Sequence, residues 1–133
     1  MSDELPEWTL DRVDPASMKV LALLLADPNP LHYDLEAARG AGFAERVNQG
    51  PSNMAMLINM LRAAFPGGRV TRLQVQLRGT VLAGQRVRAG GRIVRREPVA
   101  DGESVTCEVH LDGPDGVRVL AGEATVHTRE VTG

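Results

Sequence analysis

The 133-residue sequence predicts an α+β domain in which a curved antiparallel sheet wraps around one buried central helix. Residues 51–65 are apolar on nearly every side at helical spacing, which is typical of a buried helix. From residue 70 onward the apolar residues recur with a period of two, which indicates strands. The length suits one domain, which we place at residues 1–133 with its core at about residues 10–128.

The first helix is predicted to begin at Asp14 and Pro15. Asp14 is a favourable N-cap because its side chain accepts backbone hydrogen bonds, and Pro15 suits the first helical position, where its missing N–H costs nothing. The helix must end before Pro28, because a residue that precedes proline is pushed out of the α region. Residues 27–30 read Asp-Pro-Asn-Pro, so we expect a stiff loop there.

Two more helices are predicted before the strands begin. A short helix runs from about Asp34 to Arg39, and a loop with several glycines connects it to the buried helix at residues 51–65. Arg62 is the only charged residue of the buried helix, and the sequence Pro-Gly-Gly at 66–68 ends it.

Four long antiparallel strands are predicted in the second half of the chain. The first changes phase near Thr71, and the glycine pair at 90–91 indicates a bend in the second. The sequence Gly-Pro-Asp-Gly at 113–116 has the composition of a hairpin turn. The apolar phase of the last strand changes at Gly122, so we expect a β-bulge at that residue.

Composition disfavours several classes of function. Aromatic residues make up only 3% and the net charge is −2, so neither stacked bases nor a basic surface favours a nucleic-acid partner. The longest apolar run, residues 20–26, is too short to cross a membrane. The first residues are acidic and lack the features of a signal peptide, so we expect a soluble, cytoplasmic protein.

The sequence predicts no metal site. Its single cysteine, Cys107, excludes an internal disulfide and a cysteine-based zinc site, and we expect a buried, inert thiol there. His110 and His127 stand alone on strands without the spacing of metal ligands, and we expect them at the surface.

Asp27 and His32 are the first candidates for chemistry. They are five residues apart across two prolines, and on a proline-stiffened loop their side chains can converge. A carboxylate and an imidazole within reach of one water form an acid–base pair that can add or remove water. By spacing alone, the alternative is an aspartate that ends a helix and a histidine in a polar loop.

The segment from Asp27 to His32, Asp-Pro-Asn-Pro-Leu-His, resembles the Asp-x-Asn-Pro-x-His motif of the MaoC-like hydratase/dehydratase family, which has the hot-dog fold. Tyr-Asp at 33–34, Ala-Ala at 37–38 and Gly-Phe at 42–43 continue the pattern. The resemblance covers roughly residues 10–128. It is specific in the six-residue motif and generic in the strands.

The resemblance implies a hydro-lyase of fatty acid metabolism that needs no cofactor. It would add water to 2-enoyl thioesters in an (R)-specific manner, or dehydrate 3-hydroxyacyl thioesters. Carried over, Asp27 and His32 hold and activate the water and exchange the proton at the α-carbon. Asn29 shapes the loop beside the substrate. The thioester carbonyl is polarised by the backbone N–H of Gly50, where the dipole of the buried helix favours enolate charge.

The chain departs from the family pattern at the start of the buried helix. The family usually has His-Gly there, whereas this chain has Gln49 and Gly50. Pro51 supplies no N–H, so the oxyanion site has one donor fewer. Some members carry a serine inside the helix; here the aligned residue is alanine, and Ser52 and Asn53 lie one turn earlier. We predict that Gln49, Ser52 and Asn53 contact the substrate.

Between Arg69 and Arg96 there are eight arginines and no acidic residue. One interpretation is a solvated strand face. The other is a landing site for the phosphates of coenzyme A or of an acyl-carrier protein's phosphopantetheine, because a guanidinium binds phosphate oxygens through two N–H groups. On the second interpretation, Arg78 and Arg86 contact the substrate.

Two other functions stay open at this point. A hot-dog thioesterase would usually place an acidic residue on or just before the central helix, and residues 47–68 contain none. A non-catalytic hot-dog subunit of a heteromeric dehydratase is the second alternative, which the presence of both Asp27 and His32 disfavours. The family's members pair into a continuous sheet, so the resemblance implies a homodimer or a heteromer with another hot-dog chain.

Overall fold

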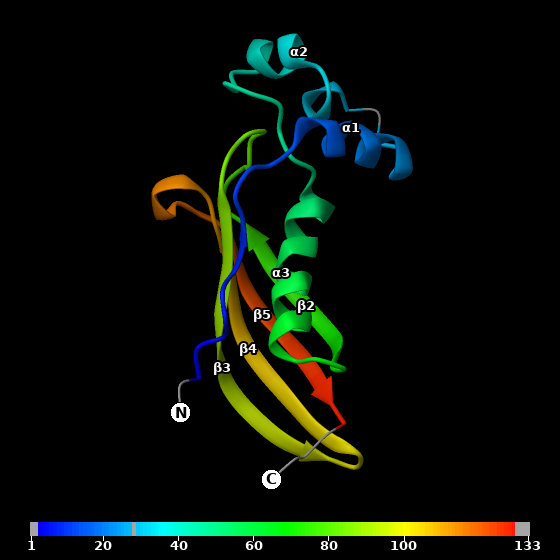
Figure 1. The fold of residues 1–133 in the computed structure, drawn as a ribbon, viewed down its shortest axis with the longest axis vertical. Coiled ribbons are helices and arrows are strands. Elements are labelled where there is room, and N and C mark those ends of the chain that lie inside the picture. The colour runs from blue at the N-terminus through cyan, green and yellow to red at the C-terminus, as the bar shows by residue number, and fades with distance from the viewer. Residues whose placement is uncertain (1–2, 28, 130–133) are drawn as a thin grey trace.

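The computed structural model describes residues 3–27 and 29–129 and shows a long curved sheet with one helix packed along its concave face (Figure 1). The five strands lie in the order β1-β3-β4-β5-β2, and every neighbouring pair is antiparallel. The strands are β1 (Trp8–Leu10), β2 (Arg69–Leu77), β3 (Val87–Val99), β4 (Gly102–Asp112) and β5 (Arg118–Thr128). This arrangement confirms the predicted α+β class.

The helices occupy the predicted places. They are α1 (Pro15–Leu24), the 3₁₀ turn η1 (Pro30–His32), α2 (Leu35–Gly40), α3 (Gly50–Ala64) and the 3₁₀ turn η2 (Pro114–Gly116). An Asp14 side-chain oxygen accepts the N–H of Ala16 at 2.9 Å, as expected of an N-cap. Asp34 caps α2 in the same way and so lies just outside the helix. Pro28, which was predicted to limit the first helix, lies outside the described residues.

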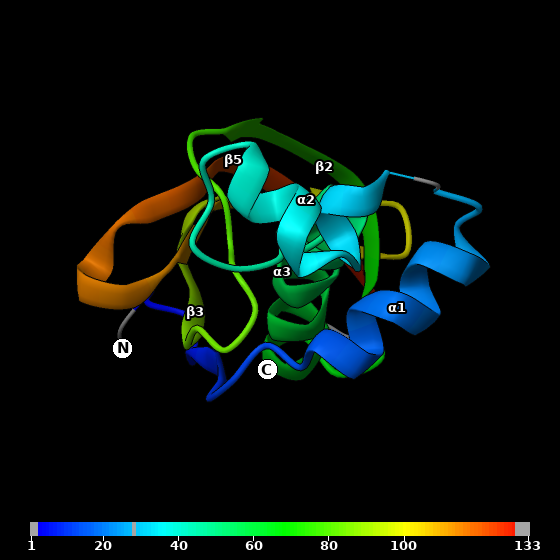
Figure 2. The same ribbon diagram turned by 90° about the horizontal axis from the view of Figure 1, so that it is seen from above.

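Seen from above, α2 lies over the N-terminal end of α3 and α1 extends to one side of it (Figure 2). We call residues 15–40, which include α1, η1 and α2, the cap, and α3 with the sheet the body. No helix among the described residues is long and apolar enough to span a membrane.

The core lies between α3 and the sheet. Helix α3 contributes Met56, Leu57, Met60 and Leu61. Strands β3, β4 and β5 supply most of the remaining buried side chains, including Val87, Val105, Cys107, Leu111, Ala124 and Val126. Residues on the same face of a strand alternate with outward-facing residues, which explains the period of two in the sequence.

Helix α3 is buried on one side only in the single chain. Its side toward the sheet is buried, whereas Ala55, Asn59 and Ala63 are exposed. The apolar composition of a helix shows which of its faces can be buried. It does not show which element or subunit covers each face. Leu77, expected in the inward phase of β2, is 68% exposed at the end of an edge strand.

The phase change in the last strand occurs three residues earlier than predicted. Leu111 pairs with Leu120 and Asp112 pairs with Arg118, so Val119 is the extra residue of a bulge. Gly122 itself pairs regularly with its neighbours on both sides. A Cβ at Gly122 would meet the backbone carbonyl of Gln74, so the glycine is needed for the close approach of β2.

Three other features of the sheet can be compared with the sequence predictions. The register of β2 shifts between Val70 and Arg72, which confirms the slip expected near Thr71. In β3 the shift lies between Ile93 and Arg95 rather than at the glycine pair 90–91, where the missing side chains make room for β4. The short strand β1 had no clear sequence signal, because it is only three residues long.

Candidate active site

The backbone of α1 leads directly into the turn that carries Asp27. The N–H of Asp27 donates to the carbonyl oxygen of Ala22 at 2.9 Å, and the N–H of Leu25 donates to that of Leu21 at 2.8 Å. Ala26 has a φ of 51°, in the left-handed region that alanine rarely adopts. The turn therefore redirects the chain sharply and attaches Asp27 to the last turn of α1.

His32 faces Asp27 across the loop, as the spacing predicted. Its Nε2 lies 3.1 Å from Oδ2 of Asp27, and the two side chains are 12% and 35% exposed, respectively. Its Nδ1 lies 2.7 Å from the carbonyl oxygen of Val47. Because a carbonyl oxygen can only accept, Nδ1 carries a proton and Nε2 is the nitrogen that faces Asp27.

This geometry brings two acceptors together. A neutral His32 with its proton on Nδ1 offers a lone pair at Nε2, and an ionised carboxylate also offers only lone pairs. A close contact between them therefore needs one proton in between, carried by either group or supplied by a shared water. Such a pair can both remove a proton from water and return one.

Asn29 is used within the loop. Its Oδ1 accepts the N–H of Leu31 at 3.1 Å, and its own N–H donates to Oδ1 of Asp27 at 3.2 Å. These two bonds close the turn that starts η1 and hold the carboxylate of Asp27 in place.

A short extended segment, residues 46–50, connects the cap to α3. The N–H of Val47 donates to the carbonyl oxygen of Leu31 at 2.9 Å. Val47 therefore accepts a hydrogen bond from Nδ1 of His32 and also donates one to the loop that carries His32. The N–H of Asn48 donates to the carbonyl oxygen of Val81 at 2.7 Å. This segment therefore holds the site against the loop that joins β2 and β3.

The side chains at the start of α3 are placed differently from each other. Gln49 is fully buried, and its Nε2 donates to the carbonyl oxygen of Met18 in α1 at 2.8 Å. Asn53 is 2% exposed, and its Oδ1 accepts from Nδ2 of Asn48 at 2.7 Å. Ser52 is half-buried. These contacts occupy Nε2 of Gln49 and Oδ1 of Asn53.

Gly50 is exposed and is the first residue of α3. The first N–H groups of a helix have no partner within the helix, and the helix dipole makes them favourable for negative charge. Nothing lies within 4 Å of the position where a Cβ of Gly50 would stand, so the backbone is open to a ligand on that side.

The two arginines predicted as substrate contacts lie outside this cluster. Arg86 is exposed and lies 3.7 Å from Oδ1 of Asp11. Arg78 is exposed just after β2, and its backbone N–H donates to the carbonyl oxygen of Val119. Among the described residues, no hydrogen bond or ion pair joins either arginine to Asp27 or His32.

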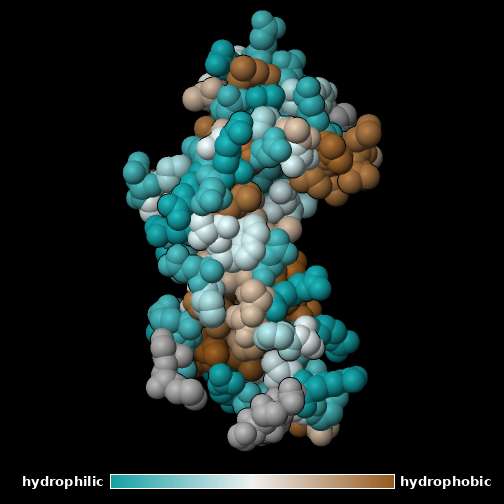
Figure 3. Space-filling view, viewed as in Figure 1, coloured by the Kyte–Doolittle hydropathy of each residue, from teal (hydrophilic) through white to brown (hydrophobic). Residues whose placement is uncertain are grey.

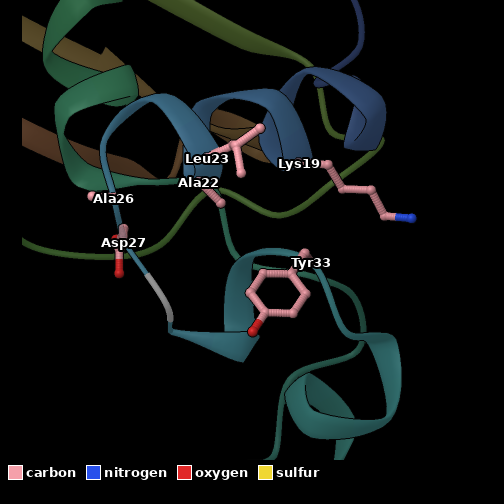
Figure 4. Close-up of a pocket in the computed structure, with 6 residues that line it drawn as sticks. All are labelled: Lys19, Ala22, Leu23, Ala26, Asp27 and Tyr33. Atoms are coloured by element: carbon pink, nitrogen blue, oxygen red, sulfur yellow. The ribbon is translucent and has the colours of Figure 1, made fainter.

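A mainly apolar pocket of about 600 Å³ opens beside Asp27 (Figure 4). Its lining comes from one face of α1 and from the loop after it: Lys19, Ala22, Leu23, Ala26, Asp27 and Tyr33. The space-filling view shows the neighbouring apolar surface of α1 as a brown patch (Figure 3), where Val20, Leu23 and Leu24 are more than half exposed. The sequence analysis missed this pocket, although the exposed apolar run of residues 20–26 was its signal.

The other titratable candidates lie on the sheet. Cys107 is fully buried in the core, and burial raises the pKa of its thiol to about 11. His127 and His110 are half-buried rather than at the surface, and each faces an aspartate: Nε2 of His127 lies 3.0 Å from Oδ1 of Asp101. Within residues 3–27 and 29–129 no group of His, Cys, Asp or Glu side chains could hold a metal ion.

The fold and the site define a hot-dog protein with an Asp–His pair at the N-terminal end of its central helix. The pattern of the family described as MaoC like domain matches residues 5–113. The chain therefore belongs to the MaoC-like domain family.

Known proteins with similar sequence or fold agree with this assignment. The mitochondrial 3-hydroxyacyl-[acyl-carrier-protein] dehydratase of Arabidopsis thaliana is 34% identical over 70 residues, and the match covers 53% of this chain and 42% of that relative. The unliganded R-hydratase PhaJ1 of Pseudomonas aeruginosa has a TM-score of 0.85 at 20% identity, over 98% of this chain and 82% of that one. A chain of the ChsH1–ChsH2 complex of Mycobacterium tuberculosis has a TM-score of 0.80 at 19% identity, over 96% and 97%.

Proposed function

We propose that this chain is a hydro-lyase that adds water to 2-enoyl thioesters and, in reverse, dehydrates (R)-3-hydroxyacyl thioesters. The observation that carries the proposal is the 3.1 Å contact between His32 and Asp27, with His32 held by Val47, three residues before α3. Membership of the MaoC-like family and the similarity to a 3-hydroxyacyl-[acyl-carrier-protein] dehydratase support it.

The proposed reaction needs one water and moves two protons. The oxygen of the water bonds to C3 of the enoyl group as its proton passes to the Asp27–His32 pair, and the electron pair of the double bond moves into the thioester as an enolate. The pair then returns a proton to C2, so the net addition is one water. We assign both transfers to the pair as a unit, because Nε2 of His32 and Oδ2 of Asp27 are in contact at 3.1 Å.

The backbone N–H of Gly50 is the proposed donor to the enolate oxygen. A donor held in advance at a helix N-terminus stabilises charge as it develops in the transition state. Pro51, the next residue, has no N–H to add.

The apolar pocket beside Asp27 is the proposed place of the acyl group. Its lining by Ala22, Leu23, Ala26 and Tyr33 offers mostly carbon to a ligand, and its carboxylate edge is the proposed reaction centre. Asn29, in the loop of Asp27, and Ser52 and Asn53, in the first turn of α3, remain proposed contacts for the substrate. Arg78 and Arg86 remain proposed contacts for the phosphates of coenzyme A or of a carrier protein's phosphopantetheine.

We also propose that the chain works as a pair of hot-dog subunits. The side of α3 that carries Ala55, Asn59 and Ala63 is exposed in the single chain, so this face of the central helix is open to a partner subunit. Among proteins of similar fold, the ChsH1–ChsH2 complex is named as an assembly of two different chains. The partner is therefore either a second copy or a different hot-dog chain.

The direct test is hydration of crotonyl-CoA and of a longer 2-enoyl-CoA, followed by loss of the conjugated enoyl absorbance. We expect Asp27→Asn and His32→Ala each to lower kcat/KM by about 10²–10⁴-fold, the usual contribution of a positioned general acid or base.

A second His–Asp pair supplies a matched control. His127 and Asp101 are 3.0 Å apart at the end of the sheet opposite the cap (Figure 1). His127→Ala and Asp101→Asn should leave hydration unchanged. Release of free thiol without loss of the enoyl group would contradict the proposal and indicate a thioesterase. Activity that appears only with a co-purified second hot-dog chain, and that survives both site variants, would identify a non-catalytic subunit.

A further inference from the structure

The side chain of Gln49 has a buried polar atom that destabilises the folded state. It is fully buried, and its Oε1 receives no hydrogen bond from any described residue. Its orientation is set, because Nε2 must face the carbonyl oxygen of Met18, which can only accept. A buried acceptor without a donor destabilises the folded state, so another role must account for an amide at this position.

The partner of Gln49 does not need the bond. The carbonyl oxygen of Met18 lies inside α1, where the helix pattern already supplies the N–H of Ala22. An apolar side chain of the same length, such as methionine, would remove the unpaired Oε1 and leave no new polar group unpaired. The hydrogen bond of Gln49 is therefore dispensable for folding but still determines where α1 lies.

The position of α1 determines the position of Asp27. The N–H of Asp27 is bonded to Ala22 at 2.9 Å, so the carboxylate moves with the last turn of this helix. Only Met18 and Ala22 of α1 are buried. With so few packed side chains, a buried hydrogen bond to the middle of α1 is a main constraint on where the helix lies.

The position of His32 is determined by the same short segment. Val47, two residues before Gln49, accepts from Nδ1 of His32 and donates to Leu31. Gly50, one residue after Gln49, carries the proposed oxyanion donor. Residues 47, 49 and 50 thus hold the imidazole, the helix of the carboxylate and the N–H group, respectively.

We propose that Gln49 is a positioning residue that sets the separation of Asp27 and His32 by holding α1 at Met18. It touches neither substrate nor the reacting atoms. The proposal rests on the function proposed above for its kinetic consequences, but the placement of the two side chains can be measured without any substrate.

The kinetic test compares Gln49→Met with Gln49→His. Methionine keeps the length and removes the bond; histidine restores an N–H at a similar reach. We expect kcat for 2-enoyl-CoA hydration to fall about 10–100-fold in Gln49→Met, the cost of misplacing a catalytic group by about 1 Å. KM should stay within about twofold, because the apolar pocket that binds the acyl group keeps its lining. The thermal unfolding midpoint should be unchanged or higher, and Gln49→His should recover most of kcat.

Thr106→Val, which alters another buried polar side chain, on β4, is the matched control and should leave kcat unchanged. A parallel loss of thermal stability and kcat in Gln49→Met would overturn the proposal in favour of a purely structural role. Unchanged kcat in that variant would overturn it as well.

A spectroscopic test separates this proposal from the proposed function. The imidazole ¹⁵N signals of His32 should move in Gln49→Met toward their positions in Asp27→Asn, and should stay in place in Thr106→Val. If they move but the wild type hydrates no enoyl thioester, the proposed function fails and the positioning role stands. If they do not move, the positioning role fails whatever the activity.

Discussion

The cap and the body are stabilised by different interactions. Helix α3 buries five residues, whereas α1 buries two, α2 one and η1 none. The cap instead relies on side-chain hydrogen bonds at the starts of its helices, from Asp14, Asn29 and Asp34. The proposed acid–base pair, Asp27 and His32, therefore lies in the region with less buried apolar surface. Stability and activity should therefore respond to different substitutions.

The largest expected effect on stability is in the body. Leu57 is fully buried where α3 meets the sheet, so Leu57→Ala removes packed carbon and leaves a cavity. We expect the free energy of unfolding, measured by urea denaturation, to fall by about 2–5 kcal/mol. The kcat of the remaining folded protein should be unchanged, because Asp27 and His32 lie in the cap and Leu57 is seven residues beyond Gly50 on α3. A loss of kcat below the unfolding transition would show that the two regions are not separable.

A second prediction concerns whether water reaches the core of the body. Burial raises the pKa of the Cys107 thiol from 9.0 in the unfolded chain to about 11 in the folded chain. The unfolded state therefore loses this proton first, so the thiol's contribution to stability is complete below pH 9 and is lost as the pH rises from 9 to about 11. The loss is at most about 3 kcal/mol, since each pKa unit corresponds to about 1.4 kcal/mol.

The measurement is the free energy of unfolding between pH 8 and pH 11 for the wild type and for Cys107→Ala. The wild type should lose more stability over this range, because only it carries the thiol. If the unfolding free energy of the two proteins changed equally with pH, water would reach Cys107 despite its burial in the core.

The smallest expected effect is in the cap. An Asp34 side-chain oxygen accepts the N–H groups of Glu36 and Ala37, and Asp34→Ala removes this N-cap. We expect a loss of about 1 kcal/mol, seen as faster hydrogen exchange of the α2 amides, while the amides of β4 keep their protection. Asp34→Ser should behave like the wild type, because serine is also a good N-cap. Equal acceleration in β4 would mean that the cap unfolds only together with the body.

Sequence reasoning predicted best the features that local chemistry determines. Asp14 and Pro15 start α1 for reasons contained in those two residues, and the pairing of Asp27 with His32 follows from a loop stiffened by proline. The alternation of apolar residues placed β2 to β5 because a strand's buried face is visible in its own pattern.

The features that could not be predicted depend on partners distant in the chain. The bulge is at Val119 because β4 has one residue fewer opposite it, whereas Gly122 is a glycine because β2 comes close. The side chain of Gln49 donates to Met18, 31 residues earlier, and no local pattern in the sequence indicates this contact. The role of Val47 carries no side-chain signal at all, because its backbone carbonyl holds His32.

Lys19 is the only lysine among fifteen basic residues, and it lies at the rim of the pocket beside Asp27 (Figure 4). Thioesters acylate free amines, whereas a guanidinium stays protonated and does not act as a nucleophile. The arginine-rich sheet can therefore meet activated acyl groups without being modified by them. Stray acylation of a side-chain amine would be confined to one residue of α1, where it would both cancel a charge and narrow the pocket mouth.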